Sequence, residues 1–282
     1  MRKTLRRKKL LELINSLESL PILPHAYQDL VEAIESDKSI KNIGRIISSD
    51  ASIAAKTLQV ANSAFYGGKT ISSVTDAISH LGLNFIKDQA LAFGIIKNTT
   101  WEENQINLVE EIFRHSFMVD KYVPVFYKLL YNEKQNKALG SPGVTHDIGK
   151  IIMLRFFRER YELIVAHQQD NPEKSFYECE LSLGFKDSSH AAIGAFILDM
   201  WNLPRSFVES ALFHHAPNQS SEDCRNLVTA IQYTDNVLNS LYNAGKGNTP
   251  GLSRMVCRQI SREKLDQVAG EIIRDRSRMF DF

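Results

Sequence analysis

The residues best suited to chemistry in this 282-residue chain are histidines and aspartates that occur in a spaced series. His146 and Asp147 are adjacent, and Lys150 follows them closely. Imidazole nitrogen and carboxylate oxygen are preferred ligands of divalent transition metals. The pair alone predicts little, because adjacent His and Asp residues occur by chance in many chains. The pair gains weight from the rest of the series, which consists of His115, His190, His214, His215 and Asp235.

The predicted positions of several of these donors allow them to meet. His115 lies within an apolar helical pattern and is expected to point inward. His146 and Asp147 would be about 100° apart on a helix, so both could lean into one site. Asp235 lies in an apolar helical stretch, where a buried carboxylate is costly unless it is paired or metal-bound. We therefore predict a site for zinc, iron or manganese with His115, His146, Asp147 and Asp235 as ligands.

A second ion would use the remaining nitrogens of the series. His190, His214 and His215 offer these nitrogens, and Asp147 could bridge the two ions. Such a centre would lower the pKa of a bound water and would hold a phosphoryl oxygen as a Lewis acid. Lys150 could then steady a phosphate oxygen as a point charge. The prediction is thus one or two divalent ions, with Lys150 and Asp147 as the candidate catalytic residues.

Each candidate also has a plainer interpretation. A lone histidine on an apolar helix face is more often a hydrogen-bonded core residue than a ligand, and this sets aside His25, His80 and His167. His190 could belong to a helix cap, and His214 with His215 could complement the dipole of a helix C-terminus. Lys150 could be a solvated helix lysine. A Ser-His-Asp triad is disfavoured, since the chain has no GxSxG elbow, and a Walker A loop and a GxGxxG fingerprint are also absent.

The composition limits the class of protein and its surroundings. Hydrophobic residues at 43% and charged residues at 24% are ordinary for a soluble globular protein. A net charge of +1 gives no general attraction to nucleic acid, so no nucleic-acid partner is expected. Three scattered cysteines without a CxxC pair are typical of reduced thiols in the cytoplasm. No apolar run approaches the roughly 20 residues that cross a bilayer, so a cytoplasmic chain without a membrane span is expected.

The apolar residues recur with a helical period, and no long alternating strand pattern occurs. This predicts an all-α fold of two helical lobes, residues 1–100 and 101–282, with a polar joint near 98–105. In the first lobe we expect helices at 10–17, 26–34, 39–48, from Asp50 or Ser52 toward 62, from Ser72 or Ser73 to 81, and at 85–96. In the second we expect helices at 106–130, around His146, and at 175–183, 188–201, 204–214, 226–241 and 252–279. Pro124 should kink or split the first of these.

Several stretches carry a family resemblance. Residues 61–67 read Ala-Asn-Ser-Ala-Phe-Tyr-Gly, and residues 146–150 read His-Asp-Ile-Gly-Lys. Together with Leu-Pro-Ile-Leu-Pro at 20–24 and Trp-Asn-Leu-Pro at 201–204, they resemble the HDOD domain. HDOD domains are bacterial signalling-output relatives of the HD superfamily of metal-dependent phosphohydrolases. The resemblance covers about residues 15–240 and implies an all-α fold whose C-terminal lobe is similar to an HD domain.

The resemblance also implies roles for single residues. In HD phosphohydrolases the core ligands would fall on His115, His146, Asp147 and Asp235. In the related HD-GYP phosphodiesterases of cyclic dinucleotides, further roles would fall on Glu111, Lys150, His190, His214 and His215. Many HDOD proteins have lost part of this set and are thought to act by protein contact, whereas this sequence keeps it. It departs from HD-GYP after His215, where Ala216 and Pro217 follow and no Gly-Tyr-Pro occurs.

The expected function is therefore a bacterial signal-transduction output module that retains an HD-type metal site. It would act mainly through contacts with a signalling protein, and its input would come from another chain or a small molecule. The alternative is an active metal-dependent phosphohydrolase or phosphodiesterase acting on a nucleotide-like phosphate ester. A closed ligand sphere would favour the first function, and an open two-metal cleft floored by Lys150 would favour the second.

Overall fold

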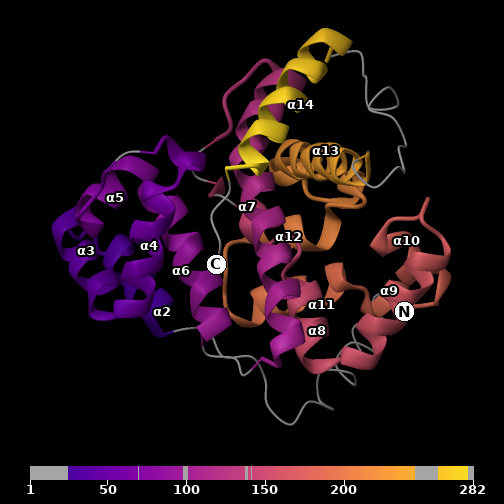
Figure 1. Ribbon diagram of the computed structural model, residues 1–282, viewed down its shortest axis with the longest axis horizontal. Coiled ribbons are helices and arrows are strands. Elements are labelled where there is room, and N and C mark those ends of the chain that lie inside the picture. The colour runs from indigo at the N-terminus through magenta and orange to yellow at the C-terminus, as the bar shows by residue number, and fades with distance from the viewer. Residues whose placement is uncertain are drawn as a thin grey trace. The chain divides into compact units, whose positions relative to one another are not determined.

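The computed structural model describes residues 25–68, 70–97, 101–136, 139–140, 142–244 and 260–278. Within these ranges the chain consists of α-helices and short 3-10 turns, and no strand occurs there (Figure 1). The predicted all-α fold is confirmed. The chain divides into two compact units, whose described residues lie within 25–114 with 270–278, and within 115–269. The predicted helix at 10–17 and the stretch at 20–24 fall outside the described residues.

The first unit is a bundle of short helices around an aliphatic core. Its helices are α2 (His25–Glu35), α3 (Ile40–Ser49), α4 (Ala51–Asn62), α5 (Val74–Leu81) and α6 (Leu83–Lys97). Each helix sends at least one fully buried aliphatic side chain into that core, as shown by Leu30, Ile43, Ile53, Ile78 and Ile86. The aliphatic core thus accounts for the helical period of the apolar residues in this part of the sequence.

Side-chain caps decide where two of these helices begin. Asp50 accepts hydrogen bonds from the backbone N–H groups of Ser52 and Ile53 at 3.0 and 3.2 Å. Ser73 accepts one from the backbone N–H of Asp76 at 3.1 Å. The sequence left two candidates for each cap, and the structure selects Asp50 and Ser73. Such caps satisfy backbone donors that the first turn of a helix leaves free.

The segment that follows α4 is a built turn. Its anchor is Asn62, whose amide donates to the carbonyl of Ile71 at 2.8 Å and accepts from the N–H of Ile71 at 2.6 Å. The 3-10 turn η1 (Ala64–Tyr66) lies between them and ends at Gly67, whose φ of 101° favours glycine. Helix α4 therefore ends at residue 62, as predicted, and a turn follows it.

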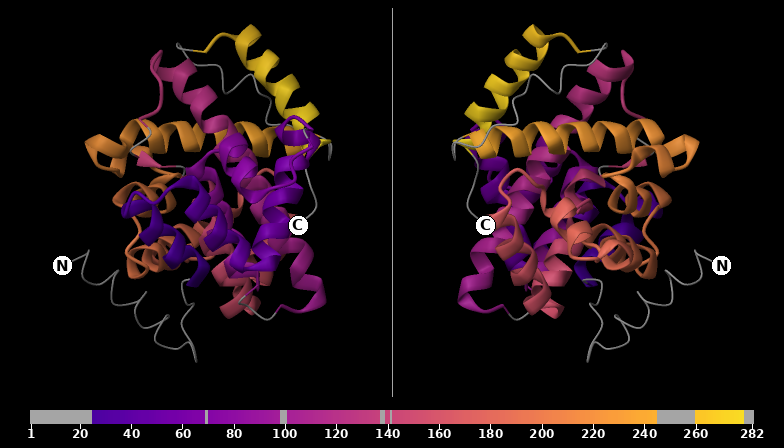
Figure 2. Two further views of the ribbon diagram at one scale, coloured as in Figure 1. Left: turned by 90° about the vertical axis from the view of Figure 1, so that its left-hand side faces the viewer. Right: turned by 90° about the vertical axis from the view of Figure 1, so that its right-hand side faces the viewer.

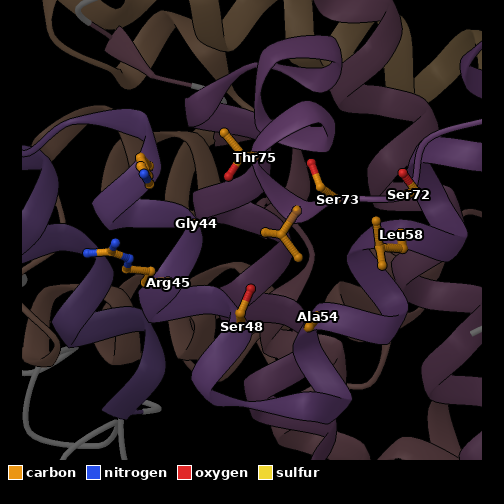
Figure 3. A pocket seen from close by; sticks show the side chains of 10 residues that line it. Gly44, Arg45, Ser48, Ala54, Leu58, Ser72, Ser73 and Thr75 are labelled. Atoms are coloured by element: carbon orange, nitrogen blue, oxygen red, sulfur yellow. The ribbon is translucent and has the colours of Figure 1, made fainter.

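The first unit also carries an open groove of about 450 Å³ between α3, α4 and the start of α5 (Figure 3). Its lining includes two cationic side chains and several hydroxyl groups, among them Lys41, Arg45, Ser48, Ser73 and Thr75. All of the residues that line it lie between 41 and 75, so the groove contains none of the predicted metal ligands.

The second unit contains both long and short helices. They are α7 (Glu103–Tyr131, from His115 onward), α8 (Ile148–Phe156), α9 (Arg158–Asp170), α10 (Phe176–Ser182), α11 (His190–Met200), α12 (Arg205–Phe213) and α13 (Glu222–Ala244). The last helix, α14 (Arg262–Arg276), begins here. Figure 2 shows α7 and α13 as long, uninterrupted coils. Aromatic and aliphatic side chains fill the core, including Phe117, Phe126, Ile197, Phe207 and Leu227. No helix in the described ranges is both long and apolar enough to span a membrane.

Helices α8 and α11 approach each other backbone to backbone. A Cβ atom placed on Gly149 would lie 1.8 Å from the carbonyl oxygen of His190 and 2.8 Å from the amide nitrogen of Gly194. A Cβ on Gly194 would lie 3.0 Å from the amide nitrogen of Gly149. Only glycine fits at position 149, and this contact brings the start of α8 against the start of α11.

Pro124 does not split the helix that contains it. The helix α7 runs continuously from Glu103 to Tyr131 with Pro124 inside and exposed. Large side chains on both sides of the proline are buried, for example Tyr122 and Phe126. Their packing offsets the hydrogen bond that proline removes.

Two further helix predictions are corrected. His146 and Asp147 do not lie within a helix but in a turn between the 3-10 helix η3 (Pro142–Thr145) and α8. A bond between the His146 ring and the Gly143 carbonyl holds this turn. The helix α14 begins at Arg262, since Ile260 and Ser261 are not helical and Ser261 caps Lys264, and the part of the prediction at 252–259 falls outside the described residues. A break at Phe157, which separates α8 from α9, was not predicted.

Candidate metal centre

The seven predicted ligands all lie in the second unit and come from five elements. His115 comes from α7, His146 and Asp147 from the turn before α8, and His190 from the first position of α11. His214 and His215 follow the end of α12, and Asp235 lies in α13. The structure brings them into two groups, in each of which the candidate ligand atoms lie within 4.8 Å of one another. The groups are His115, His146, Asp147 and Asp235, and His190, His214 and His215.

The first group contains a buried histidine nitrogen that faces the two acids. His146 Nδ1 lies 2.7 Å from the carbonyl oxygen of Gly143, and since a carbonyl only accepts, Nδ1 donates. In the neutral ring, Nε2 then presents a lone pair to the group, 3.5 Å from Asp147 and 3.8 Å from Asp235. His115 Nε2 lies 2.8 Å from the same Asp235 oxygen. His146 Nε2 is buried with no hydrogen-bond partner in the described residues, as suits a metal ligand.

The second group, which we call the histidine trio, places three ring nitrogens face to face. His190 Nε2 lies 3.3 Å from His214 Nε2 and 3.1 Å from His215 Nε2. His214 Nδ1 donates to the carbonyl oxygen of Ala211 at 2.9 Å, and His190 Nδ1 donates to Glu180 Oε2 at 2.7 Å. Lone pairs on facing Nε2 atoms repel unless a proton or a metal ion lies between them. The trio therefore fits a cation.

Asp147 reaches both groups. Its Oδ1 atom lies 3.3 Å from His190 Nε2 and 3.6 Å from His214 Nε2, and this oxygen has no hydrogen-bond partner in the described residues. Its Oδ2 atom lies 3.5 Å from His146 Nε2. The geometry is compatible with the bridging role predicted for Asp147.

Both buried carboxylates are ionised. Burial raises the pKa of Asp147, but Lys150 and His146 outweigh it and hold that pKa well below its usual range. Burial also raises the pKa of Asp235, but the hydrogen bond from His115 and the nearby His146 ring outweigh it and hold that pKa well below its usual range. Carboxylates must be deprotonated to bind metal, so both side chains are in the required state.

The histidines divide into two kinds. Burial lowers the pKa of His214 to about 3 and the pKa of His215 well below its usual range, so both rings are neutral. Burial also lowers the pKa of His190, but Glu180 and Asp147 outweigh it and raise that pKa to about 9. The pKa of His146 is raised too, since Asp147 and Asp235 outweigh burial. Protons on His146 and His190 are those that a bound metal would displace.

Lys150 is engaged with the first group. Its ammonium donates to Asp147 Oδ2 at 2.6 Å and lies 5.4 Å from the centre of the Phe176 ring. Its side chain is 18% exposed, the highest exposure in the ion pairs around Asp147. Burial lowers the pKa of Lys150, but Asp147 outweighs it and keeps the ammonium charged. Its role in holding phosphate stays a prediction.

Some residues near the site were not singled out from the sequence. Asn239 donates to Asp235 Oδ1 at 2.8 Å, and its spacing of four residues on a helix is a signal that could have found it. Glu180 holds His190, and no sequence pattern marked it. Glu111, which the resemblance implied as an additional acid, is exposed and belongs to neither group. His80 bonds to the carbonyl of Tyr66 at 2.8 Å, as expected for a histidine that is not a ligand.

Solved structures with the same fold come from several bacteria. An HDOD domain protein of unknown function from Geobacter sulfurreducens matches with a TM-score of 0.70 at 20% identity, covering 99% of this chain and 91% of that one. A protein from Marinobacter aquaeolei VT8, described as a candidate signal transduction protein, matches with a TM-score of 0.75 at 17% identity, covering 98% and 64%. A protein from Shewanella amazonensis SB2B, described as a candidate metal-dependent phosphohydrolase, gives 0.61 at 22%, covering 97% and 98%.

A curated relative and a family model agree with these structures. An uncharacterized protein of Treponema pallidum (strain Nichols) is 23% identical over 244 residues, which is 83% of this chain. The match spans 44% of that relative, so this chain corresponds to less than half of its length. The model of the HDOD domain matches residues 20–217 of this chain. Since this match covers most of the sequence, the chain belongs to the HDOD domain family.

Proposed function

We propose that the chain is a bacterial signal-transduction output module that holds one or two divalent metal ions and acts mainly through contacts with a protein partner. The burial of the converging ligands carries this proposal. His146, His190 and His214 are 0% exposed, and Asp147 and Asp235 are 2% and 4% exposed. A phosphate ester needs access to a metal ion, and ligands buried to this degree favour a closed centre.

The donor set decides which residues would hold each ion. The first ion would be held by His115, His146, Asp147 and Asp235, and the second by the histidine trio, with Asp147 as the bridge. A set of imidazole nitrogens and carboxylate oxygens suits zinc, iron or manganese. Because the ligands come from five elements, the two ions together would tie these elements to one another and add their binding free energy to the stability of the unit.

Two observations support action through a partner protein. The sequence after His215 continues with Ala216 and Pro217, where HD-GYP enzymes carry an acid, and no Gly-Tyr-Pro follows. The fold also matches the Marinobacter protein that is described as a candidate signal transduction protein. The partner we propose is a signalling protein.

Phosphohydrolase activity is the second candidate function, and Lys150 favours it. The Lys150 side chain keeps 18% exposure beside Asp147 and carries a full positive charge. A bound metal would supply Lewis acidity and an activated water. Lys150 would then turn from Asp147 to a phosphate oxygen, and the substrate would be a nucleotide-like phosphate ester. The Shewanella protein of the same fold is described as a candidate metal-dependent phosphohydrolase.

One experiment separates the two functions. The purified chain is loaded with zinc, manganese or iron(II), its metal content is measured by elemental analysis, and phosphate release or diester cleavage is assayed. The substrates are phosphomonoesters, phosphodiesters and cyclic dinucleotides. We expect retained metal and no turnover above the level of an Asp147→Ala variant.

The controls make each outcome informative. Asp147→Ala and His146→Ala should lose metal, whereas His80→Ala should keep it, because the His80 ring bonds to a backbone carbonyl in the other unit. Metal-dependent turnover that disappears in Asp147→Ala would support the phosphohydrolase function instead. A wild-type chain that retains no metal would contradict both functions.

A further inference from the structure

Glu180 accepts two hydrogen bonds from one histidine. Its Oε1 atom accepts the backbone N–H of His190 at 2.6 Å, and its Oε2 atom accepts the ring Nδ1–H of the same residue at 2.7 Å. Both side chains are 0% exposed. One carboxylate thus fixes the main chain and the ring of His190 together, at the first turn of α11.

A buried carboxylate is costly unless its charge is compensated. The imidazole of His190 compensates it directly, and the guanidinium of Arg160 adds a second attraction. Burial lowers the pKa of Arg160, and the charge of Glu180 partly offsets this shift. The Arg160 side chain is itself held, since it donates to Ser188 at 2.6 Å and lies 3.8 Å from the centre of the Phe185 ring. Glu180 is therefore held in a supported position.

The bond from His190 Nδ1 to Glu180 determines which ring nitrogen of His190 faces the other two histidines of the trio. A carboxylate at Nδ1 keeps the proton there and leaves Nε2 toward His214 and His215. Tyr177 lies one turn before Glu180 on α10. Its ring stacks on the His215 ring, with the ring centres 4.2 Å apart and an angle of 12° between the planes. Helix α10 therefore contacts two of the three imidazoles in the trio.

We propose that Glu180 is a positioning residue that governs the second metal position separately from the first. By fixing His190 it allows the histidine trio to hold an ion, while His115, His146 and Asp235 hold theirs without it. This inference rests on the proposed function, because it requires that the centre binds metal. Carboxylates that hold a metal-binding histidine from behind typically change metal affinity about 10–100-fold when removed.

The variant Glu180→Gln tests the proposal with little change in shape. A glutamine amide has one oxygen, so it accepts only one of the two bonds. The matched control is Glu209→Gln. Glu209 is 7% exposed in the same unit and accepts the backbone N–H of Ser221 at 2.7 Å, but it contacts no histidine of either group. Zinc content and zinc affinity of the three proteins are measured by elemental analysis and by competition with a chelator.

We expect two zinc ions per wild-type chain and per Glu209→Gln chain. Glu180→Gln should keep the first ion and bind the second at least about tenfold more weakly. Two equally tight ions in Glu180→Gln would overturn the positioning role and leave the proposed function intact. No zinc in the wild-type chain would instead contradict the proposed function.

A measurement on the Nδ1 proton of His190 tests its hydrogen bond to Glu180 without relying on metal content. Nitrogen-15 NMR of the metal-free wild-type protein should show a slowly exchanging proton at His190 Nδ1, and this protection should be lost in Glu180→Gln. In the zinc-loaded wild-type protein, the Nδ1 proton should remain and zinc should bind at Nε2. Zinc bound at Nδ1 of His190 would overturn the proposal, and this result does not depend on whether the variant folds.

Discussion

The ammonium of Lys150 lies 2.6 Å from Asp147 Oδ2, while the other oxygen of this carboxylate has no hydrogen-bond partner in the described residues. One oxygen is thus neutralised by a cation of the chain itself, and the other faces the Nε2 atoms of His190 and His214. A single buried carboxylate therefore has an internal cation on one side, and its other side is where we propose that an external cation binds.

We predict that Lys150→Met destabilises the metal-free protein by about 3 kcal/mol, because it leaves a buried carboxylate without its cation. Zinc should restore a large part of this loss, since an ion at the centre supplies positive charge to Asp147. Urea denaturation with and without zinc measures both effects. As a control, Lys128→Met removes an exposed lysine of α7 and should change stability by less than about 0.5 kcal/mol. Equal effects of the two variants would contradict the prediction.

Metal removal should lower the melting temperature. A ligand at one hundred times its dissociation constant stabilises the native state by about 2.7 kcal/mol. We therefore expect a chelator to lower the melting temperature of the zinc-loaded wild-type chain and of His80→Ala. In His146→Ala the chelator should have a smaller effect, since one ligand of the first group is missing. Scanning calorimetry gives the comparison, and an identical chelator effect in all three proteins would show that His146 is not a ligand.

The variant Gly149→Ala should disturb both the fold and the centre. Its Cβ would meet the carbonyl oxygen of His190 at 1.8 Å, so α8 and α11 must separate. Overpacking of this kind costs about 3 kcal/mol or more when backbone atoms are in the way. Gly194→Ala is the graded control, because its nearest contact is 3.0 Å. Urea denaturation should give the larger loss for Gly149→Ala, together with weaker zinc retention, and the reverse order would refute the packing argument.

We predict that Asp88 makes the free energy of unfolding fall as pH rises. This side chain of α6 is 0% exposed, and neither carboxylate oxygen has a hydrogen-bond partner in the described part of the chain. Burial raises its pKa to about 8, and Lys87 offsets only part of this. The folded chain therefore binds an extra proton between about pH 4 and pH 8, and stability declines across this window by about 1.4 kcal/mol per pH unit.

Asp88→Asn removes this dependence, because an amide has the shape of the protonated acid and does not ionise. We expect the variant to match the wild-type chain near pH 5 and to exceed it near pH 8.5. Urea denaturation at several pH values measures the difference. If the two stability curves stay parallel over the whole range, Asp88 does not titrate as its environment indicates.

The helices were predictable where local chemistry decides them. Ser73 caps α5 and Gly82 ends it. Serine is common at the start of a helix and glycine at its end, so the sequence indicates both roles. The turn at His146 and Asp147 was not predictable in the same way. It depends on the bond between the His146 ring and the Gly143 carbonyl, and the sequence pattern there is apolar enough to resemble a helix.

The candidate ligands were easier to single out from the sequence than the residues that hold them in place. Histidine and aspartate are uncommon within apolar helices, so His115 and Asp235 stood out from their surroundings. Glu180 did not, since it lies in a polar-looking stretch and only tertiary packing buries it against His190. Whether the predicted boundary between residues 100 and 101 separates two lobes stays a prediction.

The imidazole rings of the centre are oriented in two ways, by nearby backbone carbonyls or by a side chain from another helix. His146 and His214 are oriented by backbone carbonyls three residues earlier in the chain, so each belongs to a turn that carries its own alignment. His190 depends on Glu180, which lies on a different helix. If α10 moved away from α11, His190 would lose its orientation in the trio, whereas the His146 ring would keep its own. A chain that held both proposed ions would therefore release the ion at the trio first and keep the ligands of the first group in place.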